Sequence, residues 1–201
     1  MCASKPNVTE LWSVLLASLF SEIKIKLSLL ALIFCLKFNF AQEIQLKIET
    51  KESSIKYKGD HLLHSWEGIN NNVNGIAILN SKSNKIEKIA ILIYVRDFDS
   101  GNPGRDAHSL EVLEALKYPE IRFYSESIKI VEDSVNFKGT FNFHGIKIEK
   151  KLAGNLNRKN DIWYITGNFK LVPSDFGIEL PSFLSVKMKN LLDIDYSIAL
   201  K

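Results

Sequence analysis

The chain has 201 residues, of which 46% are hydrophobic, and a formal net charge of +3. This length and apolar content suffice for one sizeable domain, and all-β barrels often use a chain of this length undivided. Lysine and glutamate alternate without a long basic tract, which argues against a nucleic-acid-binding protein. Both cysteines, Cys2 and Cys35, precede residue 42, so we expect neither a disulfide nor thiol chemistry in a processed protein.

The N-terminal segment differs from the rest of the chain. Lys24 and Lys26 precede an apolar run, and Ala41 is a small residue before a polar start. This order is typical of a secretory signal peptide. We therefore expect residues 1–41 to be an upstream extension plus a signal peptide. Cleavage after Ala41 would leave a periplasmic or secreted mature domain of residues 42–201.

This segment holds two short apolar runs, residues 11–20 and 27–36. Each run is about ten residues long, which is too short to cross a bilayer alone, so we expect no stable membrane span after processing. A signal peptide that begins near Ile23 would have an ordinary length. This leaves open whether residues 1–23 are translated.

Beyond residue 42 the hydrophobic residues recur with a period of two, which indicates strands. A turn cluster at Asn70–Gly75 and a tight connection at His144-Gly145 separate some of them. In chain order the predicted strands are residues 43–49, 54–58, 76–80, 85–96, 121–131, 135–143, 146–156, 161–171 and 190–200.

The segment 85–96 is apolar on both of its faces. The two faces carry Ile89, Ile91, Ile93 and Val95 on one side, and Ala90, Leu92 and Tyr94 on the other. A strand that is apolar on both sides has to be covered on both sides. We expect one face to line the interior of a barrel and a helix or a long loop to cover the other.

One helix is predicted among these strands. It follows a turn rich in glycine, with Asp106 as its N-cap, and Leu110, Leu113 and Leu116 lie at helical spacing before Pro119 ends it. A single helix between strands of a meander indicates a barrel with a lid or edge helix, and not a βαβ enzyme core.

The predicted barrel interior is either filled by side chains or just wide enough for one small ligand. Gly139 and Gly167 face inward among large aromatic residues. They either relieve strain as the sheet coils or leave room for a cavity. The aromatic residues around them are either ordinary core or the lining of that cavity.

Catalytic and metal-binding patterns are weak. His61 and His64 have no third ligand nearby in the sequence, and we expect His144 to make a local hydrogen bond at its turn. His108 has a carboxylate and a guanidinium near it, which suit either an acid–base centre or a simple cap at the barrel mouth. Because a nucleophile elbow and a phosphate-binding loop are both missing from the sequence, we expect no enzyme, no metal site and no cofactor.

Four motifs follow one another at defined spacing. They are Arg105-Asp106-x-His108, Tyr118-Pro119-x-Ile121-x-Phe123-x-Ser125, Gly139-x-Phe141-x-Phe143-His144-Gly145 and Asp175-Phe176-Gly177-Ile178. Together they resemble the YceI-like family over residues 43–201. The resemblance implies an exported bacterial protein with an all-β fold, an antiparallel extended lipocalin-like β-barrel of about eight strands with one short α-helix. It also implies an interior that binds a polyisoprenoid or an isoprenoid quinone.

The expected ligand site is the barrel interior, with three polar residues, Arg105, Asp106 and His108, at its rim. The expected ligand contacts are Ile91, Ile93, Phe123, Gly139, Phe141, Phe143, Trp163, Phe169 and Tyr196. An alternative is an exported structural or stress-related barrel with a packed interior, which acts through a surface partner. A third hypothesis is an isoprenoid-modifying enzyme that uses His108 and Asp106. The head group and length of the ligand and a homodimer stay open.

Overall fold

The computed structural model describes residues 16, 19–24, 26–28, 43–62, 64–183 and 186–201, and the chain divides into two compact units, Met1–Ala41 and Gln42–Lys201. In the first unit the described residues are helical and exposed. The predicted cleavage site at Ala41 lies outside the described residues, and the signal peptide stays a prediction. Within the described ranges, no helix is long and apolar enough to cross a membrane.

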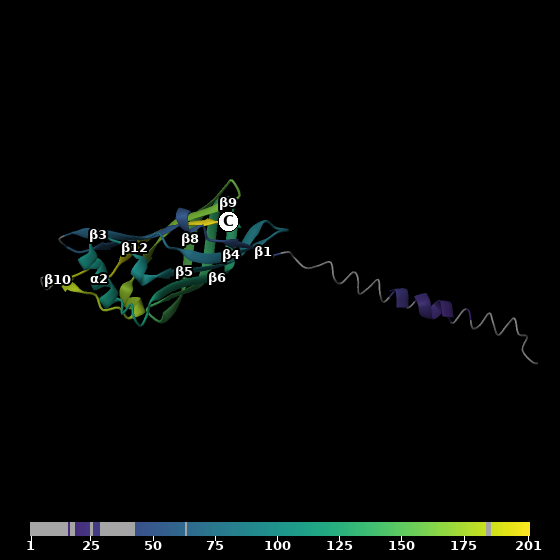
Figure 1. The fold of residues 1–201 in the computed structure, drawn as a ribbon, viewed down its shortest axis with the longest axis horizontal. Helices are drawn as coiled ribbons and strands as arrows, with labels where there is room; N and C mark the ends of the chain where they lie inside the picture. The colour runs from purple at the N-terminus through teal and green to yellow at the C-terminus, as the bar shows by residue number, and fades with distance from the viewer. Residues whose placement is uncertain (1–15, 17–18, 25, 29–42, 63, 184–185) are drawn as a thin grey trace, which may run out of the picture. The chain divides into compact units, whose positions relative to one another are not determined.

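The second unit is built around a ten-stranded antiparallel sheet with the strand order β1-β4-β5-β6-β7-β8-β9-β12-β2-β3 (Figure 1). Strands β10 (Ser182–Phe183) and β11 (Val186–Lys187) form a separate small hairpin. The strands of the main sheet are β1 (Glu43–Lys47), β2 (Ser54–Asp60), β3 (Ser65–Asn70), β4 (Asn74–Asn80), β5 (Lys85–Tyr94), β6 (Glu120–Val131), β7 (Ser134–Phe143), β8 (Ile146–Lys159), β9 (Ile162–Leu171) and β12 (Leu192–Leu200).

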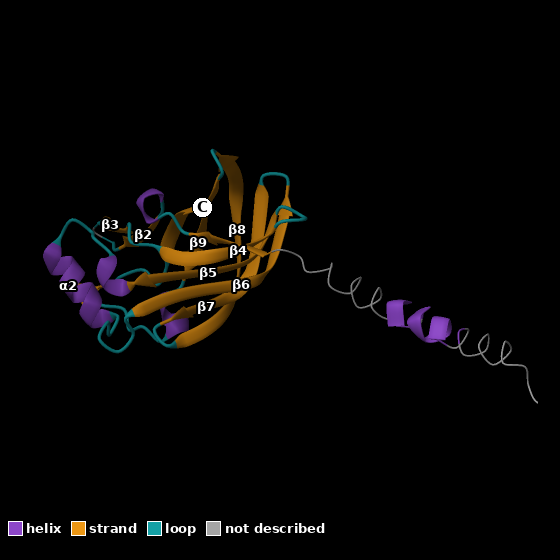
Figure 2. Ribbon diagram, turned by 45° about the vertical axis from the view of Figure 1, so that its right-hand side comes forward, coloured by secondary structure: helices purple, strands orange, loops and turns teal. Residues whose placement is uncertain are grey.

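The sheet curls until its first strand meets β12. The early residues of β12 pair with β2, whereas the end of the chain bonds to the end of β1. There the Lys47 N–H donates to the Lys201 carbonyl at 2.6 Å, and the Lys201 N–H donates back at 2.8 Å. The short 3-10 turn η2 (Thr50–Glu52) separates β1 from β2. The curled sheet of Figure 2 confirms the predicted antiparallel lipocalin-like barrel, with ten strands in the main sheet instead of about eight.

Strands β8 and β9 are paired over only half of their lengths. The pairing joins Gly154–Lys159 of β8 to Ile162–Gly167 of β9. From there the two strands diverge, because the earlier part of β8 pairs only with β7 and the later part of β9 pairs only with β12. The 3-10 turn η4 (Pro173–Phe176) lies against β7, where the fully buried Phe176 ring packs on Phe141 and Phe143 at centroid distances of 5.7 and 5.5 Å.

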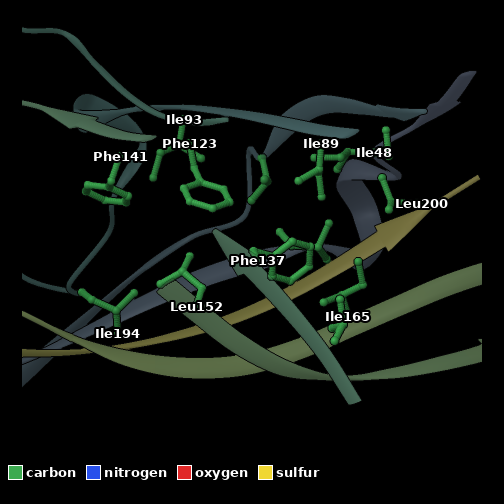
Figure 3. Packing of buried hydrophobic residues seen from close by; sticks show 14 of the residues in the cluster. Ile48, Ile89, Ile93, Phe123, Phe137, Phe141, Leu152, Ile165, Ile194 and Leu200 are labelled. Carbon is green, nitrogen blue, oxygen red and sulfur yellow. The ribbon is translucent and has the colours of Figure 1, made fainter. Parts of the chain in front are cut away.

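The core follows from the alternation of each strand. In β7, Val135, Phe137, Gly139, Phe141 and Phe143 are buried, and most of the intervening residues are exposed. Figure 3 shows the Phe137 and Phe141 rings in one cluster with Phe123 and with isoleucine and leucine side chains such as Ile194 and Leu152. Complete burial of one such side chain contributes about 1.5–3 kcal/mol, so the period of two determines which face of the sheet turns inward.

The helix begins and ends earlier than predicted. Helix α2 spans Pro103–Val112, and its N-cap is Asn102, whose side chain accepts a hydrogen bond from the Arg105 N–H at 3.1 Å. The prediction of Asp106 as N-cap is wrong, because proline favours the first helical position and starts the helix four residues sooner. The Asp106 carboxylate instead accepts from the Ser100 N–H at 3.2 Å. A positive φ of 43° at Glu114 follows the helix end.

Three further expectations need correction. Leu116 is fully exposed and does not belong to an apolar helix face. Strand β5 ends at Tyr94, two residues before the predicted end, and Ala90, Leu92 and Tyr94 on its outer face are half-buried. Strand β3 and the hairpin of β10 and β11 were not predicted, since both are short and lack a clear alternation.

Candidate ligand-binding cavity

The curled sheet encloses a cavity of about 270 Å³. Its walls are apolar side chains from the sheet, and α2 and the loop before β12 contribute Leu110, Leu113, Ile178 and Met188. It opens beside the first turns of α2, where the lining side chain of His108 is 60% exposed. Ligand sites in proteins typically have volumes of about 300–1,000 Å³, so the cavity lies near the lower end of that range.

Most of the expected ligand contacts lie on this wall. Seven of the nine line the cavity, and they come from five strands of the sheet: Ile91, Ile93, Phe123, Phe141, Phe143, Phe169 and Tyr196. Phe141 is central among them, because its ring contacts Phe169 edge-on at 5.9 Å and also packs on Phe143 and Phe176. The alternation of apolar and polar residues therefore predicted correctly that these residues face inward.

Gly139 and Trp163 are not among the lining residues. Gly139 faces inward, but a Cβ atom there would lie 2.8 Å from the end of the Phe123 ring and closer still to the Tyr124 carbonyl oxygen. The space over this glycine is therefore occupied by Phe123. Trp163 is buried at the opposite end of β9 from the cavity-lining Phe169, and the Arg158 guanidinium lies 5.0 Å above its ring.

Gly167 lies under Tyr196, its partner in the register of β9 and β12. The Tyr196 hydroxyl donates a hydrogen bond of 3.0 Å to the Ala153 carbonyl, across the point where β8 and β9 diverge. Burial raises the pKa of Tyr196 to about 12. The phenol is therefore neutral at physiological pH, and its hydrogen bond joins β12 to β8 beside the cavity.

The three expected rim residues all line the cavity. Arg105, Asp106 and His108 come from the first turns of α2, and Tyr57 of β2 lies next to them. Burial raises the pKa of Tyr57, and the negative charge of Asp106 raises it further, whereas Arg105 lowers it. Arg105, Asp106 and the Tyr57 phenol thus lie together beside an apolar interior, and two further arginines, Arg96 and Arg122, also line the cavity.

Sequence reasoning missed several groups at this mouth. Tyr57 accepts side-chain hydrogen bonds from Ser109 and Trp66, and both of these residues line the cavity. Tyr57 shares a strand face with Ile55, and that alternation was the available signal. Leu180 and Pro181 also line the wall, but they belong to an irregular loop in which no period marks the inward face.

Two histidines join segments that are distant in sequence. The His61 Nε2 atom lies 3.0 Å from the Val186 carbonyl. The His144 Nδ1 atom lies 2.9 Å from the Phe176 carbonyl, and its Nε2 atom lies 3.0 Å from the Glu114 carboxylate. The expectation of a local bond for His144 is wrong, because its carbonyl partner is 32 residues away. Among the described residues, no group of three or more His, Cys, Asp or Glu side chains could hold a metal ion.

The sequence is similar to curated bacterial proteins. Protein YceI of Salmonella newport is 26% identical over 134 residues, which cover 63% of this chain and 70% of that protein. The UPF0312 protein YE1254 of Yersinia enterocolitica is 27% identical over 174 residues, which cover 80% of this chain and 88% of the relative.

Solved structures show the same fold. BcnA of Burkholderia cenocepacia superimposes with a TM-score of 0.67 at 14% identity, over 76% of this chain and 98% of its own. A polyisoprenoid binding domain from Saccharophagus degradans gives a TM-score of 0.65 at 11% identity, over 78% and 97%. The sequence model described as YceI-like domain matches residues 46–200. This match covers nearly all of the barrel unit, and the chain therefore belongs to the YceI-like domain family.

Proposed function

We propose that the chain is an exported, non-enzymatic lipid carrier that holds the hydrocarbon chain of a polyisoprenoid or an isoprenoid quinone inside the barrel. The apolar cavity of about 270 Å³ carries this proposal. Its wall includes the seven expected contacts, and its polar groups gather at the mouth. A long apolar chain with one polar end suits this distribution, because the chain is buried while the polar end stays near water.

Burial of an apolar chain can supply enough free energy to bind the ligand, so no chemical reaction is needed. Each buried CH₂ group contributes about 0.8 kcal/mol, so an isoprene unit of five carbons contributes a few kcal/mol. Association costs roughly 4–15 kcal/mol in lost freedom of motion. Four or more buried isoprene units, about 16 kcal/mol, would therefore exceed even the upper end of that cost, and shape and apolar area would hold the ligand.

The polar end of the ligand would lie among Tyr57, Arg105, Asp106, His108 and Ser109, which line the mouth. This set offers hydrogen-bond donors and acceptors as well as one fixed positive charge. A quinone ring or another small polar head can therefore bind there.

Two comparisons support the proposal. The family match covers the barrel unit, and the structural neighbour from Saccharophagus degradans is described as a polyisoprenoid binding domain. Export rests on the signal-peptide pattern that ends at Ala41, with residues 42–201 as the mature carrier in the periplasm or outside the cell. The alternative of a packed barrel that acts only through its surface needs a filled interior, and the cavity disfavours it.

The first experiment identifies the cargo. We expect that organic solvent extracts a polyisoprenoid or isoprenoid quinone, in near-equal molar amount, from the full chain purified out of a bacterial host that makes such lipids. Mass spectrometry of the extract identifies the lipid and its length. Recovery of no lipid from well-folded protein would contradict the proposal.

A blocking substitution tests the location of the ligand. Ile91→Trp places a larger ring on the cavity wall, whereas Ile130→Trp makes the same change at a half-buried position of β6 outside the cavity. We expect the lipid content to fall at least about tenfold in Ile91→Trp, because a loss of about 1.4 kcal/mol already reduces affinity tenfold. The Ile130→Trp control should keep its lipid. Equal lipid content in both variants would place the ligand elsewhere.

A further inference from the structure

Two loops meet beside the mouth of the cavity. One connects β2 to β3 and contains His61, Leu62 and His64, and the other is the hairpin of β10 and β11. The His61 Nε2 atom lies 3.0 Å from the Val186 carbonyl. The Lys189 N–H also donates to the Asp60 carbonyl at 2.9 Å. These bonds hold the two loops against each other.

The joined loops present apolar side chains to solvent. Leu62 is 78% exposed and Val186 is 38% exposed. We call Leu62, His64, Val186 and Lys187 the tip surface. Single exposed apolar residues are normal on a protein surface, but here two of them come from separate loops that are bonded together. Loop positions usually favour Gly, Pro, Asn, Asp and Ser, so an exposed leucine at position 62 needs an explanation.

The charges around the tip surface are mainly positive. Lys187 is exposed and forms no salt bridge with any described residue, and Lys189 is 66% exposed. The carboxylate of this region is Asp60, and it lies 3.4 Å from the Lys189 Nζ atom. His64 is also exposed and becomes cationic when it is protonated. An apolar pair next to the unpaired Lys187 and the partly neutralised Lys189 matches the composition of surfaces that bind anionic membranes.

The tip surface continues directly into the cavity wall. The His64 ring lies 5.6 Å from the Trp66 ring, and Trp66 lines the cavity. Pro181 and Met188 flank the hairpin of β10 and β11, and both also line the cavity. In Figure 1 the hairpin, β3 and α2 lie at the same end of the barrel. The tip surface therefore lies beside the cavity wall at this end.

We propose that the tip surface docks on an anionic lipid bilayer. Leu62 and Val186 enter the boundary between the head groups and the acyl chains, and Lys187 faces the lipid phosphates. Tryptophan and histidine are amphipathic and lie well at the level of the head groups, which places Trp66 and the cavity entrance there. The purpose of this docking rests on the proposed lipid-carrier function, because a docked mouth lets an isoprenoid pass between bilayer and cavity without crossing water.

Vesicle flotation tests the docking. The full chain is mixed with vesicles of phosphatidylglycerol and phosphatidylcholine that contain no isoprenoid lipid, and the bound fraction gives a partition coefficient. We expect Leu62→Glu to lower this coefficient at least about tenfold, since it removes the burial of one leucine and adds a negative charge. Lys187→Glu should lower it about fivefold or more, because each lysine near an anionic surface contributes on that order.

Val131→Glu is the matched control. Val131 is 67% exposed at the end of β6 that is remote from α2 and the mouth. Like Leu62 it is an exposed apolar residue, but it lies in a different part of the surface. This variant should bind vesicles as the unchanged chain does. High salt or vesicles of phosphatidylcholine alone should weaken binding of the unchanged chain. Binding that is equal in Leu62→Glu and Val131→Glu would overturn the proposal.

The outcomes separate docking from cargo binding. Vesicle binding without any extractable lipid would support docking and contradict the carrier function. A lipid-filled protein that does not bind anionic vesicles would support the carrier function and overturn the docking proposal. A vesicle-independent dimer that Leu62→Glu converts to a monomer, measured by light scattering, would identify the tip surface as a contact between two copies of the chain and would also overturn the membrane proposal. Circular dichroism checks that each variant keeps its fold.

Discussion

Tyr196→Phe tests how much the hydrogen bond between β12 and β8 contributes to the stability of the fold beside the cavity. The hydroxyl donates to the Ala153 carbonyl at 3.0 Å, and its partner in register is Gly167 of β9. The substitution removes one oxygen atom and keeps the ring on the cavity wall. At neutral pH we expect a loss of about 1 kcal/mol in the free energy of unfolding, the usual net contribution of one hydrogen bond.

At high pH the substitution has the opposite effect on stability. The pKa of Tyr196 is raised from 10.0 to about 12 in the folded protein. Below pH 10 the phenol is neutral in both states, and its contribution to stability is fully present. Between pH 10 and about 12 only the unfolded chain loses the proton, so stability falls as the pH rises. Because the phenol is partly exposed, solvent screening limits this loss to about 1–2 kcal/mol in all. The phenylalanine variant lacks this loss.

Urea unfolding at a series of pH values from 8 to 12 measures the difference between the two proteins. We expect the unchanged chain to be the more stable protein at pH 8 and the less stable one near pH 12. Titration of all other groups is common to both proteins and cancels in the difference. Tyr57→Phe is a useful comparison, because burial also raises the pKa of that phenol. A stability difference that stays constant across this range would refute the reasoning about Tyr196.

Three more substitutions follow from the packing. Phe176→Ala removes a fully buried ring and should cost about 3–5 kcal/mol in urea unfolding, and a loss below 1 kcal/mol would mean that η4 is not packed on β7. Asn102→Ala removes the cap of α2 and should lower Tm by about 2–4 °C, whereas Asn102→Asp keeps the acceptor and should not. Gly139→Phe should abolish the native β-sheet circular dichroism, because Phe123 and the Tyr124 carbonyl occupy that space; a folded variant would show that the wall can rearrange.

The alternation of apolar and polar residues was enough to predict most of the sheet. It gave the inward face of β7 correctly from Val135 to Phe143, because a period of two leaves only one face that can be buried. The turn at His144 and Gly145 was also confirmed, with φ values of 51° and 74°. Histidine and glycine at these positions favour that backbone conformation, so the signal was local.

The start of α2 shows where local signals compete. The prediction considered only Asp106, whereas Asn102 before Pro103 also suits a helix start. In the structure Asp106 bonds to the Ser100 N–H outside the helix, which frees Asn102 to be the cap. The choice depended on where the preceding turn lies, and the backbone bonds of Asp99 with Ile69 of β3 fix the start of that turn.

The residues alone determined that this chain forms an antiparallel barrel with an apolar interior, since periodicity and turn chemistry act over a few neighbours. Only the tertiary structure decided that the Phe123 ring fills the space above Gly139, while a cavity remains near Phe141 and Phe169. Whether space stays empty depends on how side chains from distant strands fit together, and packing at this level is not encoded in the pattern of any one strand.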